Sequence, residues 1–346
     1  MTGLLRWYEQ ADANNGIIIS SKVRLARNFS KYNFSLKLSE EASAKMIHEA
    51  VKELNGLKEF ASFLEYDFKD LDDTQKIALR ERHCISDFLL QQKQAAGFIS
   101  PKEDISVMLN EEDHIRIQAY SAGNDLKSAY KKASEIDDVI GSAVHYAYDY
   151  KYGYLTICPS NAGTGMRASV MLHLPMLAAA GGIDSLASEV GRFQMKLKSV
   201  GGTGKYSIGD MYRISNLVTL GVSEKQILEN LKAIAEMVAK QEAEIQKEYI
   251  DSMPVRARDT VYRAYGVLKY ARSIDLKDAL TLLSEIRFGI LNGLVKPVKK
   301  TAAIYPIMIG ASPANLCLEA VETLTEEEIN TARADFIRKN LPEIEN

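Results

Sequence analysis

The sequence predicts an α+β domain over residues 1–253, followed by an all-helical domain over residues 254–346. The chain has 346 residues, which suggests two domains at the usual size of about 100–200 residues each. Strand-like runs in the first part flank a short acidic turn, which predicts a β-hairpin. After about Met253 the hydrophobic periodicity becomes almost entirely helical. We therefore expect a helical interaction or regulatory module at the C-terminal end.

Several segments of the first part have the composition of β-strands. The first candidate is Gly16–Ile19, which leads into the segment SSKVRLARN. Ile105–Leu109 and Ile115–Gln118 flank the acidic turn, and Tyr152–Ile157 is a further candidate. Two more strand-like runs, MKLKSV and MYRISNLV, flank a glycine-rich loop at Gly201–Gly204.

Helices are predicted from hydrophobic periodicity and from capping residues. Ser39 opens a helix that runs to about Leu54, with acidic residues in its first turn. Ser223 and Gln226 form a capping box at the start of a long amphipathic helix. The other candidates are Asp125–Tyr148, a buried helix at Arg167–Ala180, Val255–Ala271, Leu276–Phe288 and Thr325–Asn340.

Composition argues against several classes of protein. A net charge of −3 lacks the strongly basic balance of a nucleic-acid-binding protein. The three cysteines, Cys84, Cys158 and Cys317, are far apart, which supports neither a disulfide framework nor a zinc site. No run approaches the roughly 18 apolar residues of a membrane span, and the first residues lack the apolar core of a signal peptide. We expect a cytoplasmic protein with reduced thiols.

Two glycine-rich loops resemble nucleotide-binding motifs. Gly163-Thr-Gly165 lies in a G-x-G-x-x-A pattern, but the dinucleotide fingerprint belongs to a parallel β-α-β unit, and the strands here look like hairpins. The loop ending at Lys205 lacks the first glycine of a P-loop, and Tyr206 replaces its Ser or Thr. The simplest interpretation of either loop is a tight turn that needs positive φ.

Basic residues beside these loops favour phosphoryl transfer. Lys22 and Arg24 alternate onto one face of the first strand, Arg116 follows the acidic turn, and Lys198 precedes the second glycine loop. Arg167 is expected at a helix start, where backbone N–H groups favour anions. Phosphoryl transfer needs such a cage, because negative charge spreads over the phosphoryl oxygens as the bond breaks. Singly, each residue is more often a solvated surface cation.

The acidic turn Asn110-Glu-Glu-Asp-His114 holds three adjacent carboxylates. Spacing alone favours a solvated turn at a hairpin tip. The functional alternative is a carboxylate that orients a cationic substrate and accepts its proton. A guanidinium matches a carboxylate in geometry, and its pKa above about 12 makes assistance by a base necessary.

Four separated segments together resemble the guanidino (phosphagen) kinase family: SSKVRLARN, VMLNEEDHIRIQ, CPSNAGTGMRASVMLHLP and the ISN of MYRISNLVTLG. The match covers about Gly16 to Gln246. Only about 15 residues precede the first segment, and about 100 helical residues follow. This layout is similar to the bacterial McsB-type protein-arginine kinases, and the segment from Asp259 to Leu268 resembles their C-terminal domain.

The resemblance implies an antiparallel sheet flanked by helices, with Mg-ATP in a cleft and Mg²⁺ held through the nucleotide phosphates rather than by protein ligands. Glu112 would grip and deprotonate the guanidinium, Arg116 and Arg167 would act on the phosphoryl group, and Cys158 would lie beside the guanidinium. Without the resemblance, Cys158 would be taken as a small buried residue. By motif position, the residues implied to contact ATP are Ser20, Ser21, Lys22, Val23, Arg24, His83, Arg116, Arg167, Ala168, Ser169, Val170, Met171, Lys198, Ser199, Val200, Gly201, Gly202 and Thr203.

Three positions depart from the family pattern. Lys22 and Lys198 replace arginines, which removes two bidentate contacts to phosphate. Thr203 replaces a second catalytic glutamate of the arginine kinases, although creatine kinases also lack a carboxylate there. Protein-arginine kinases also carry a phosphoarginine-binding motif, R-D-x-x-R-A, near the C-terminus. Only Arg333 and Ala334 of this motif are present, which argues against phosphoarginine feedback.

Three functions remain open. The first is a protein-arginine kinase that marks stress-response or misfolded proteins, for which the resemblance implies a homodimer and three partners: a zinc-finger activator, a stress repressor and a Clp ATPase. The second, favoured by Lys22, Lys198 and Thr203, is a catalytically impaired nucleotide-binding adaptor. The third is a kinase for free arginine or another small guanidine. Creatine and arginine kinases carry a small helical domain before the first family segment, which helps to enclose their small substrate. The resemblance implies that a chain without this domain has an open cleft suited to a protein, which argues against the third function.

Overall fold

The computed structural model describes residues 5–10, 16–202, 207–298, 303–318, 320 and 324–345. The chain forms two compact units. The first is built from Met1–Trp7, Ser21–Ser169 and Ser215–Lys232, and the second from Tyr8–Ser20, Val170–Ile214 and Ala233–Asn346. Because the units interleave along the chain, several strands and the longest helix pass from one to the other.

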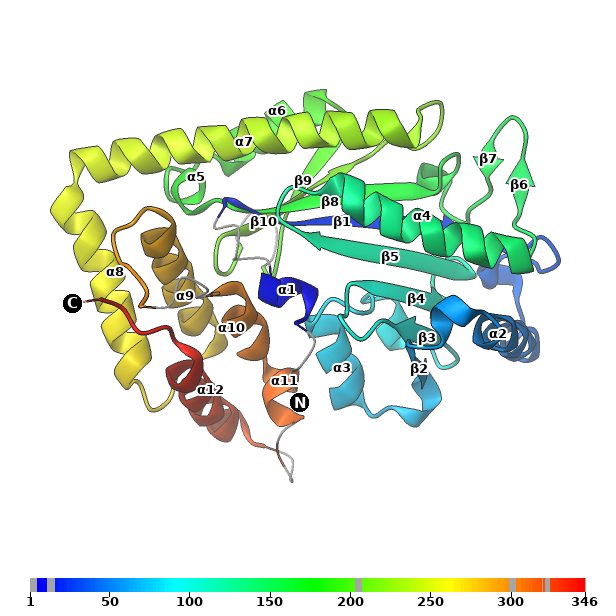
Figure 1. Ribbon diagram of the computed structural model, residues 1–346, viewed down its shortest axis with the longest axis horizontal. Helices are drawn as coiled ribbons and strands as arrows, with labels where there is room; N and C mark the ends of the chain where they lie inside the picture. The colour runs from blue at the N-terminus through cyan, green and yellow to red at the C-terminus, as the bar shows by residue number, and fades with distance from the viewer. Residues whose placement is uncertain are drawn as a thin grey trace. The chain divides into compact units, whose positions relative to one another are not determined.

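An eight-stranded sheet has the order β2-β3-β4-β5-β1-β8-β10-β9 (Figure 1). The pairs β2–β3, β3–β4 and β4–β5 are antiparallel, as is a separate hairpin of β6 and β7. The predicted α+β class with an antiparallel sheet is confirmed. The strands are β1 Ile18–Arg27, β2 Leu64–Asp67, β3 Ala96–Ile99, β4 Ile105–Leu109, β5 Ile115–Ala122, β6 Tyr148–Asp149, β7 Gly153–Tyr154, β8 Met166–His173, β9 Met195–Ser199 and β10 Met211–Asn216.

Helix α4 (Leu126–Ala143) of the first unit covers strand β5 of the sheet, and its N-cap Asp125 accepts the backbone N–H of Ser128. α2 (Glu40–Asn55) begins after Ser39, whose hydroxyl accepts the backbone N–H of Ala42 as predicted. The remaining helices that begin in this unit are α1 Trp7–Gln10, α3 Asp73–Glu81 and α7 Glu224–Ser252. None of the helices in the described ranges combines the length and apolar character needed to cross a bilayer.

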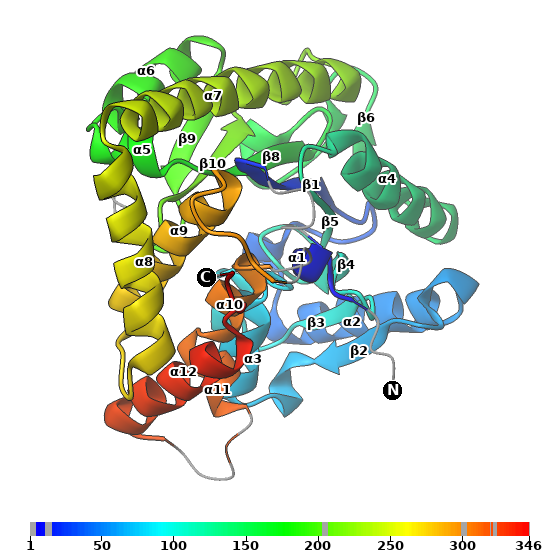
Figure 2. The same cartoon turned by 60° about the vertical axis from the view of Figure 1, so that its left-hand side comes forward.

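The second unit contains the C-terminal helices, which pack on one another (Figure 2). α8 (Pro254–Tyr270), α9 (Leu276–Leu291) and α12 (Glu326–Asn340) confirm the three predicted helices. The capping box of Thr325 and Glu328 is formed as expected. Two short helices that begin with Ile304-Tyr-Pro and Ser312-Pro were not predicted. The other helices of this unit are α5 Pro175–Ala179, α6 Ile183–Arg192, α10 Tyr305–Gly310 and α11 Pro313–Cys317.

Three predicted elements are wrong. The helix expected at Arg167–Ala180 is strand β8 followed by the short helix α5, because Arg167, Ser169 and His173 alternate with apolar residues at the period of a strand. The helix expected to reach Tyr148 ends at Ala143, where Val144 turns extended and Ala147 N–H donates to Asn28 O at 2.7 Å. Of the strand expected at Tyr152–Ile157, only β7 forms.

Candidate active site

The segment between β4 and β5, residues 110–114, is packed into the first unit. Glu111 is 4% exposed, Asp113 is 2% exposed and His114 is fully buried, so the solvated turn favoured by spacing is wrong. Asn110 has a φ of 59°, which reverses the chain directly after the buried strand β4. Glu112 is the carboxylate of this segment that keeps partial access to solvent. The turn therefore presents one acid outward and encloses two.

Asn28, which directly follows β1, holds the turn in place. Its side-chain Nδ2 donates to Asp113 Oδ1 at 2.7 Å, and its side-chain Oδ1 accepts the backbone N–H of His114 at 2.9 Å. Asp113 Oδ1 also accepts the backbone N–H of Ile157 at 2.8 Å. Buried acceptors are stable only when they are paired in this way, so Asp113 supports the structure rather than the chemistry.

His114 is held as a neutral imidazole. Its Nδ1 accepts the backbone N–H of Phe29 at 3.0 Å, which leaves the ring proton on Nε2, where it is donated to Asn33 O at 2.8 Å. Burial lowers the pKa of His114 from its ordinary value. The histidine therefore fixes the path of the chain from β1 to the turn and carries no charge.

Glu111 is committed to Arg116. The two side chains form an ion pair, and Glu111 also accepts the hydroxyl proton of Ser86 at 2.8 Å and the backbone N–H of Glu112 at 2.7 Å. Burial alone would raise the pKa of Glu111, but these partners outweigh it and the pKa is lowered. Glu111 is therefore ionised and orients Arg116.

Glu112 differs from both neighbours. Within the described part of the chain its carboxylate makes no hydrogen bond or ion pair. Burial, followed by repulsion from Asp113 and Glu111, raises the pKa of Glu112, while Arg24 and Arg116 oppose this effect. A carboxylate with a raised pKa and unused acceptor oxygens is suited to take a proton.

Three arginines lie on neighbouring strands of the sheet. Arg116 is on β5, Arg24 on β1 and Arg167 on β8, and these strands are adjacent in the order β5-β1-β8. The Nε atom of each guanidinium is buried and has no hydrogen-bond partner among the described residues. Three buried donors without acceptors are a set that an anion with several oxygens would satisfy.

The charges of these arginines act on one another. Enclosure of the guanidinium, followed by repulsion from Arg116, lowers the pKa of Arg24 to about 9, so Arg24 remains a cation at neutral pH. Enclosure also lowers the pKa of Arg167, against the attraction of Cys158 and Glu112. The interactions place Arg24, Arg116, Arg167 and Glu112 in one electrostatic group, as expected for a phosphate cage beside a base.

The environment of Arg167 differs from the sequence expectation. Arg167 is the second residue of strand β8, so the expected contribution of a helix N-terminus is absent at this position. Instead the backbone beside it is fixed by Asn216, which accepts the N–H of Ala168 at 2.8 Å and donates to Met166 O at 3.2 Å. The positive charge at this point comes from the side chain itself.

The loop at Gly163–Gly165 is a tight turn, as the simplest interpretation predicted. Gly165 has a φ of 62°, and a Cβ there would lie 2.5 Å from Arg27 Nη1 and 2.7 Å from Ala26 O. Arg27 is buried, forms an ion pair of 2.6 Å with Asp137, and lies 3.5 Å from the centroid of the Tyr154 ring. The loop packs on this arginine, and the strand that follows it rules out the dinucleotide fingerprint.

Lys22 and His83 meet at an aromatic cluster. Lys22 Nζ lies 4.8 Å from the centroid of the Tyr120 ring, on which Trp7 stacks at 4.3 Å. The His83 ring is 6.2 Å from Tyr120, and its backbone has a φ of 64°. Gln118 Nε2 donates to His83 O at 2.8 Å, which stabilises this conformation. The replacement of arginine by Lys22 thus occurs where an aromatic face attracts a cation.

Cys158 is partly exposed, so its assignment as a small buried residue is wrong. Its Sγ lies 3.0 Å from Ser160 Oγ, and the charge of a thiolate there would act on Arg167. Next to it, Asn161 Oδ1 accepts a hydrogen bond from Arg24 Nη2 at 3.4 Å. Cys158 therefore belongs to the neighbourhood of the arginines.

The other predicted nucleotide contacts remain predictions. Ser21 and Val23 are buried on β1, and Ser21 Oγ donates to Gly123 O at 2.9 Å. Ala168 and Ser169 are buried on β8. Ser20, Val170, Met171, Lys198, Ser199, Val200, Gly201 and Gly202 belong to the second unit, and Thr203 lies outside the described residues.

Glu111, Ser86, Asn28 and Asn161 were not assigned roles from the sequence. Each lies within or beside a family segment, but only pairing across the fold shows what it contacts. Glu111 and Glu112 also line a cavity of about 450 Å³, called here the Glu112 pocket. Its other lining residues are Ser35, Leu38, Glu40, Ser43, Phe88, Gln91, Gln92, Lys93, Gln94, Asn110 and Ile157.

Comparison with known proteins shows which family the chain resembles. Residues 45–245 match the profile of the ATP:guanido phosphotransferase C-terminal catalytic domain, and residues 254–346 match that of the protein-arginine kinase McsB C-terminal domain. A protein-arginine kinase of Clostridium kluyveri is 39% identical over 334 residues, 95% of each chain. One from Bacillus mycoides is 36% identical over 338 residues, 97% of this chain and 95% of that protein. The domain boundary at residue 253 remains a prediction.

Solved structures share the fold. The duplicated taurocyamine kinase from Schistosoma mansoni aligns with a TM-score of 0.61 and 22% identity, over 75% of this chain and 38% of that chain. Lombricine kinase aligns with a TM-score of 0.58 and 21% identity over 68% of each chain. The profile matches and the near full-length relatives confirm the predicted resemblance: the chain belongs to the ATP:guanido phosphotransferase family and carries the C-terminal domain of the McsB protein-arginine kinases.

Proposed function

We propose that this protein transfers the γ-phosphoryl group of ATP to arginine side chains of other proteins. The observation that carries the proposal is the position of Glu112. It is partly exposed, lines a pocket of about 450 Å³, and lies in the same electrostatic group as three arginines with unpaired buried Nε donors. A base beside a polyanion site is what phosphorylation of a guanidinium requires.

In the proposed reaction a guanidinium nitrogen attacks the γ-phosphorus, and the bond between this phosphorus and the β,γ-bridging oxygen breaks. Glu112 accepts the proton that the nitrogen loses, and ADP leaves with the bridging oxygen. Arg24, Arg116 and Arg167 stabilise the negative charge on the phosphoryl oxygens, which increases as the bond breaks. Glu111 keeps Arg116 in place through its ion pair.

The arginine cluster fits the phosphate chain of ATP, because the three unpaired Nε donors would find acceptors on phosphate oxygens. Mg²⁺ is expected to be held through the same oxygens and would neutralise part of their charge. The nucleotide contacts from the second unit, and the one expected from Thr203, remain part of the proposal. Arg24, Arg116, Arg167 and Glu112 support catalysis in this proposal even though Lys22 and Lys198 replace arginines, because lysine still supplies a positive charge.

Protein acceptors are proposed from the relatives, which are named protein-arginine kinases. The match of residues 254–346 to a domain of such kinases supports this assignment over a kinase for a small guanidine. The zinc-finger activator, the stress repressor, the Clp ATPase, the homodimer and the cytoplasmic location stay predictions that rest on the family resemblance.

The test is to incubate the purified full chain with Mg-ATP and an arginine-rich protein, and to identify modified residues by mass spectrometry at neutral pH. We expect phosphoarginine with the wild-type protein and at least a hundredfold less with Glu112→Gln. Nucleotide affinity, measured by calorimetry, should change by less than about threefold, because Glu112 does not belong to the phosphate cage.

Each alternative predicts another result. ATP binding without any phosphoarginine, even with a candidate activator added, would contradict the proposal and favour the adaptor. Phosphorylation of free arginine but not of the protein would favour the small-guanidine kinase. A normal rate in Glu112→Gln would remove this residue from its assigned role while leaving the activity intact.

A further inference from the structure

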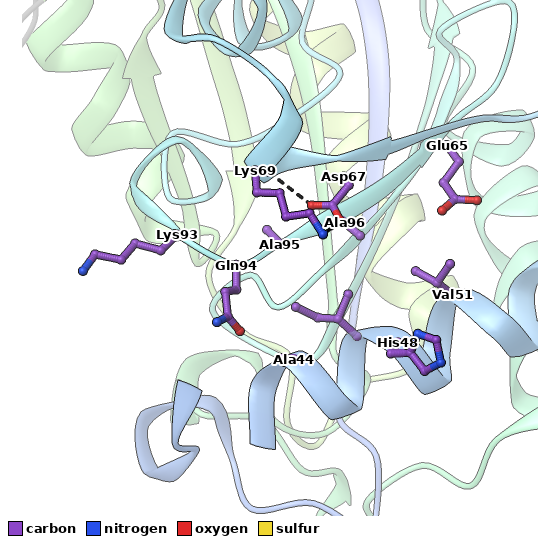
Figure 3. Close-up of a pocket in the computed structure, with 11 residues that line it drawn as sticks. Ala44, His48, Val51, Glu65, Asp67, Lys69, Lys93, Gln94, Ala95 and Ala96 are labelled. Carbon is purple, nitrogen blue, oxygen red and sulfur yellow. Dashed lines mark hydrogen bonds and ion pairs between the residues drawn. The ribbon is translucent and has the colours of Figure 1, made fainter. Parts of the chain in front are cut away.

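The Glu112 pocket adjoins a second hollow along helix α2. Glu40 and Ser43 of this helix line the Glu112 pocket. The next turns of the helix contribute Ala44, Ile47, His48 and Val51 to a hollow of about 340 Å³, called here the α2 pocket (Figure 3). Lys93 and Gln94 line both pockets, so the two form one path that starts at the proposed base.

The path is acidic. Its lining carboxylates are Glu40, Glu65, Asp67, Glu111 and Glu112. Glu111 is paired with Arg116 and Asp67 with Lys69, which leaves Glu40, Glu65 and Glu112 against Lys93 as the lining charges without an ion pair among the described residues. Lys69 Nζ forms an ion pair with Asp67 Oδ2 at 2.8 Å. In Figure 3 this pair lies across the α2 pocket from helix α2. Glu40 and Glu65 are exposed on its rim. Such a lining favours a basic or polar ligand over an acidic one.

Unpaired polar atoms also line the path. Gln94 Oε1 and Ser35 Oγ are buried and have no hydrogen-bond partner among the described residues. Gln94 lies where the two pockets meet, and its backbone is fixed because its carbonyl accepts Asn110 Nδ2 at 2.8 Å. A buried acceptor without a donor is costly, and a peptide N–H is a suitable donor.

The length of the path matches a short peptide. The helix rises about 1.5 Å per residue, so the stretch from Glu40 to Val51 spans roughly 16 Å. An extended chain advances about 3.3 Å per residue, so the same distance holds about five residues. An arginine that reaches Glu112 would thus leave one flank of its chain lying along α2.

We infer that the two pockets form a groove for the residues on one side of the acceptor arginine. The groove binds an extended segment that is polar or basic, and the α2 pocket holds the side chains a few positions from the arginine. This inference rests on the proposed function, because it assumes that Glu112 receives the guanidinium.

The test compares two substitutions on the same helix. Ala44→Tyr places a bulky side chain in the α2 pocket, and Lys45→Tyr places the same side chain at the neighbouring exposed position outside both pockets. The acceptors are acetyl-arginine amide and two peptides with four polar or basic residues either before or after the arginine. We expect Ala44→Tyr to raise the KM of one extended peptide roughly tenfold, with kcat unchanged.

Lys45→Tyr should leave the KM of every acceptor unchanged, and Ala44→Tyr should do so for acetyl-arginine amide and the other peptide. Equal KM values for both variants on both extended peptides would overturn the inference. Absence of phosphorylation of any acceptor by the wild-type protein would instead contradict the proposed function.

A charge reversal provides a second measurement. Glu40 and Glu41 both lie in the first turn of α2, so their replacement by lysine affects the helix equally, but only Glu40 lines the Glu112 pocket. Two peptides are compared, one with four basic residues on the affected side of the arginine and one with four uncharged polar residues there. Glu40→Lys should lower kcat/KM severalfold for the basic peptide and little for the uncharged peptide. The same loss in Glu41→Lys would show a general charge effect and contradict a specific groove.

Discussion

At the scale of single residues, the connection between β4 and β5 gives three neighbouring carboxylates different environments. Glu111 is neutralised by Arg116, and Asp113 is held by Asn28 and the backbone of Ile157. Of these three carboxylates, only Glu112 keeps its oxygens unpaired, and burial, followed by repulsion from Asp113 and Glu111, raises its pKa. Partial burial and the two neighbouring acids together therefore raise the proton affinity of Glu112.

This arrangement predicts the pH dependence of transfer. Glu112 must be ionised to accept a proton, and its pKa is raised, so kcat/KM should fall on acidification at a higher pH than for an ordinary glutamate. Asp113→Asn removes one repelling charge and should move this acidic limb to lower pH. The measurement is a pH–rate profile of both proteins. A limb that stays in place would show that another group controls the rate.

At the scale of secondary-structure elements, one buried ion pair joins the strand that carries Arg24 to the helix that covers the sheet. Arg27 of β1 donates to both carboxylate oxygens of Asp137 on α4, with distances of 2.6 and 3.1 Å. The same guanidinium donates to Thr164 O in the glycine loop before β8. Two of the arginine-bearing strands are thereby held against α4.

Removal of this pair should destabilise the first unit. Asp137→Ala leaves Arg27 buried without its counter-charge, which typically costs about 3–5 kcal/mol. Glu135→Ala, on the same helix, breaks only an exposed pair with Lys131 and should cost less than about 0.5 kcal/mol. Urea unfolding of the two variants measures the difference. Similar losses would mean that the buried pair contributes no more than the exposed one.

Elements with a clear local pattern could be predicted from the sequence. The hairpin around the acidic turn, the capped helices α2, α7 and α12, and the strand β9 follow from alternation or from capping residues. The strand β8 was not predicted, although Arg167, Ser169 and His173 alternate with apolar residues as in a strand, because this short pattern runs directly into the apolar start of helix α5. The site shows the same division: Glu112 and the arginines lie in segments with family patterns, whereas the roles of Asn28, Ser86 and Glu111 depend on contacts between distant segments.

At the scale of the whole molecule, the helical C-terminal part contains Arg333, a survivor of the phosphoarginine motif. Arg333 is 2% exposed and donates to Ala311 O at 2.8 Å, to Ile274 O at 2.9 Å and to Asn330 Oδ1 at 2.5 Å. Asn330 lies on α12 itself, whereas Ala311 lies between α10 and α11 and Ile274 between α8 and α9. Arg333 therefore joins α12 to two connections between other helices. The guanidinium thus stabilises the packing of the C-terminal helices.

Free phosphoarginine should therefore not activate transfer by binding to the C-terminal helices. The remaining arginine is enclosed and engaged by internal acceptors, and the rest of the motif is absent. The check is to measure transfer to a protein acceptor with and without millimolar phosphoarginine, with free arginine as the control. A change caused by phosphoarginine alone would show that another part of the chain binds this group.

The attachment of the acidic turn to Asn28 has a consequence for accuracy. Arg24 lies on β1 and Asn28 directly follows this strand, so roughly 13 Å of extended backbone separates the proposed phosphate ligand from the residue that holds the turn of Glu112. In the proposed function, one continuous segment therefore positions both the guanidinium that would bind the donor phosphate and the turn that carries the base.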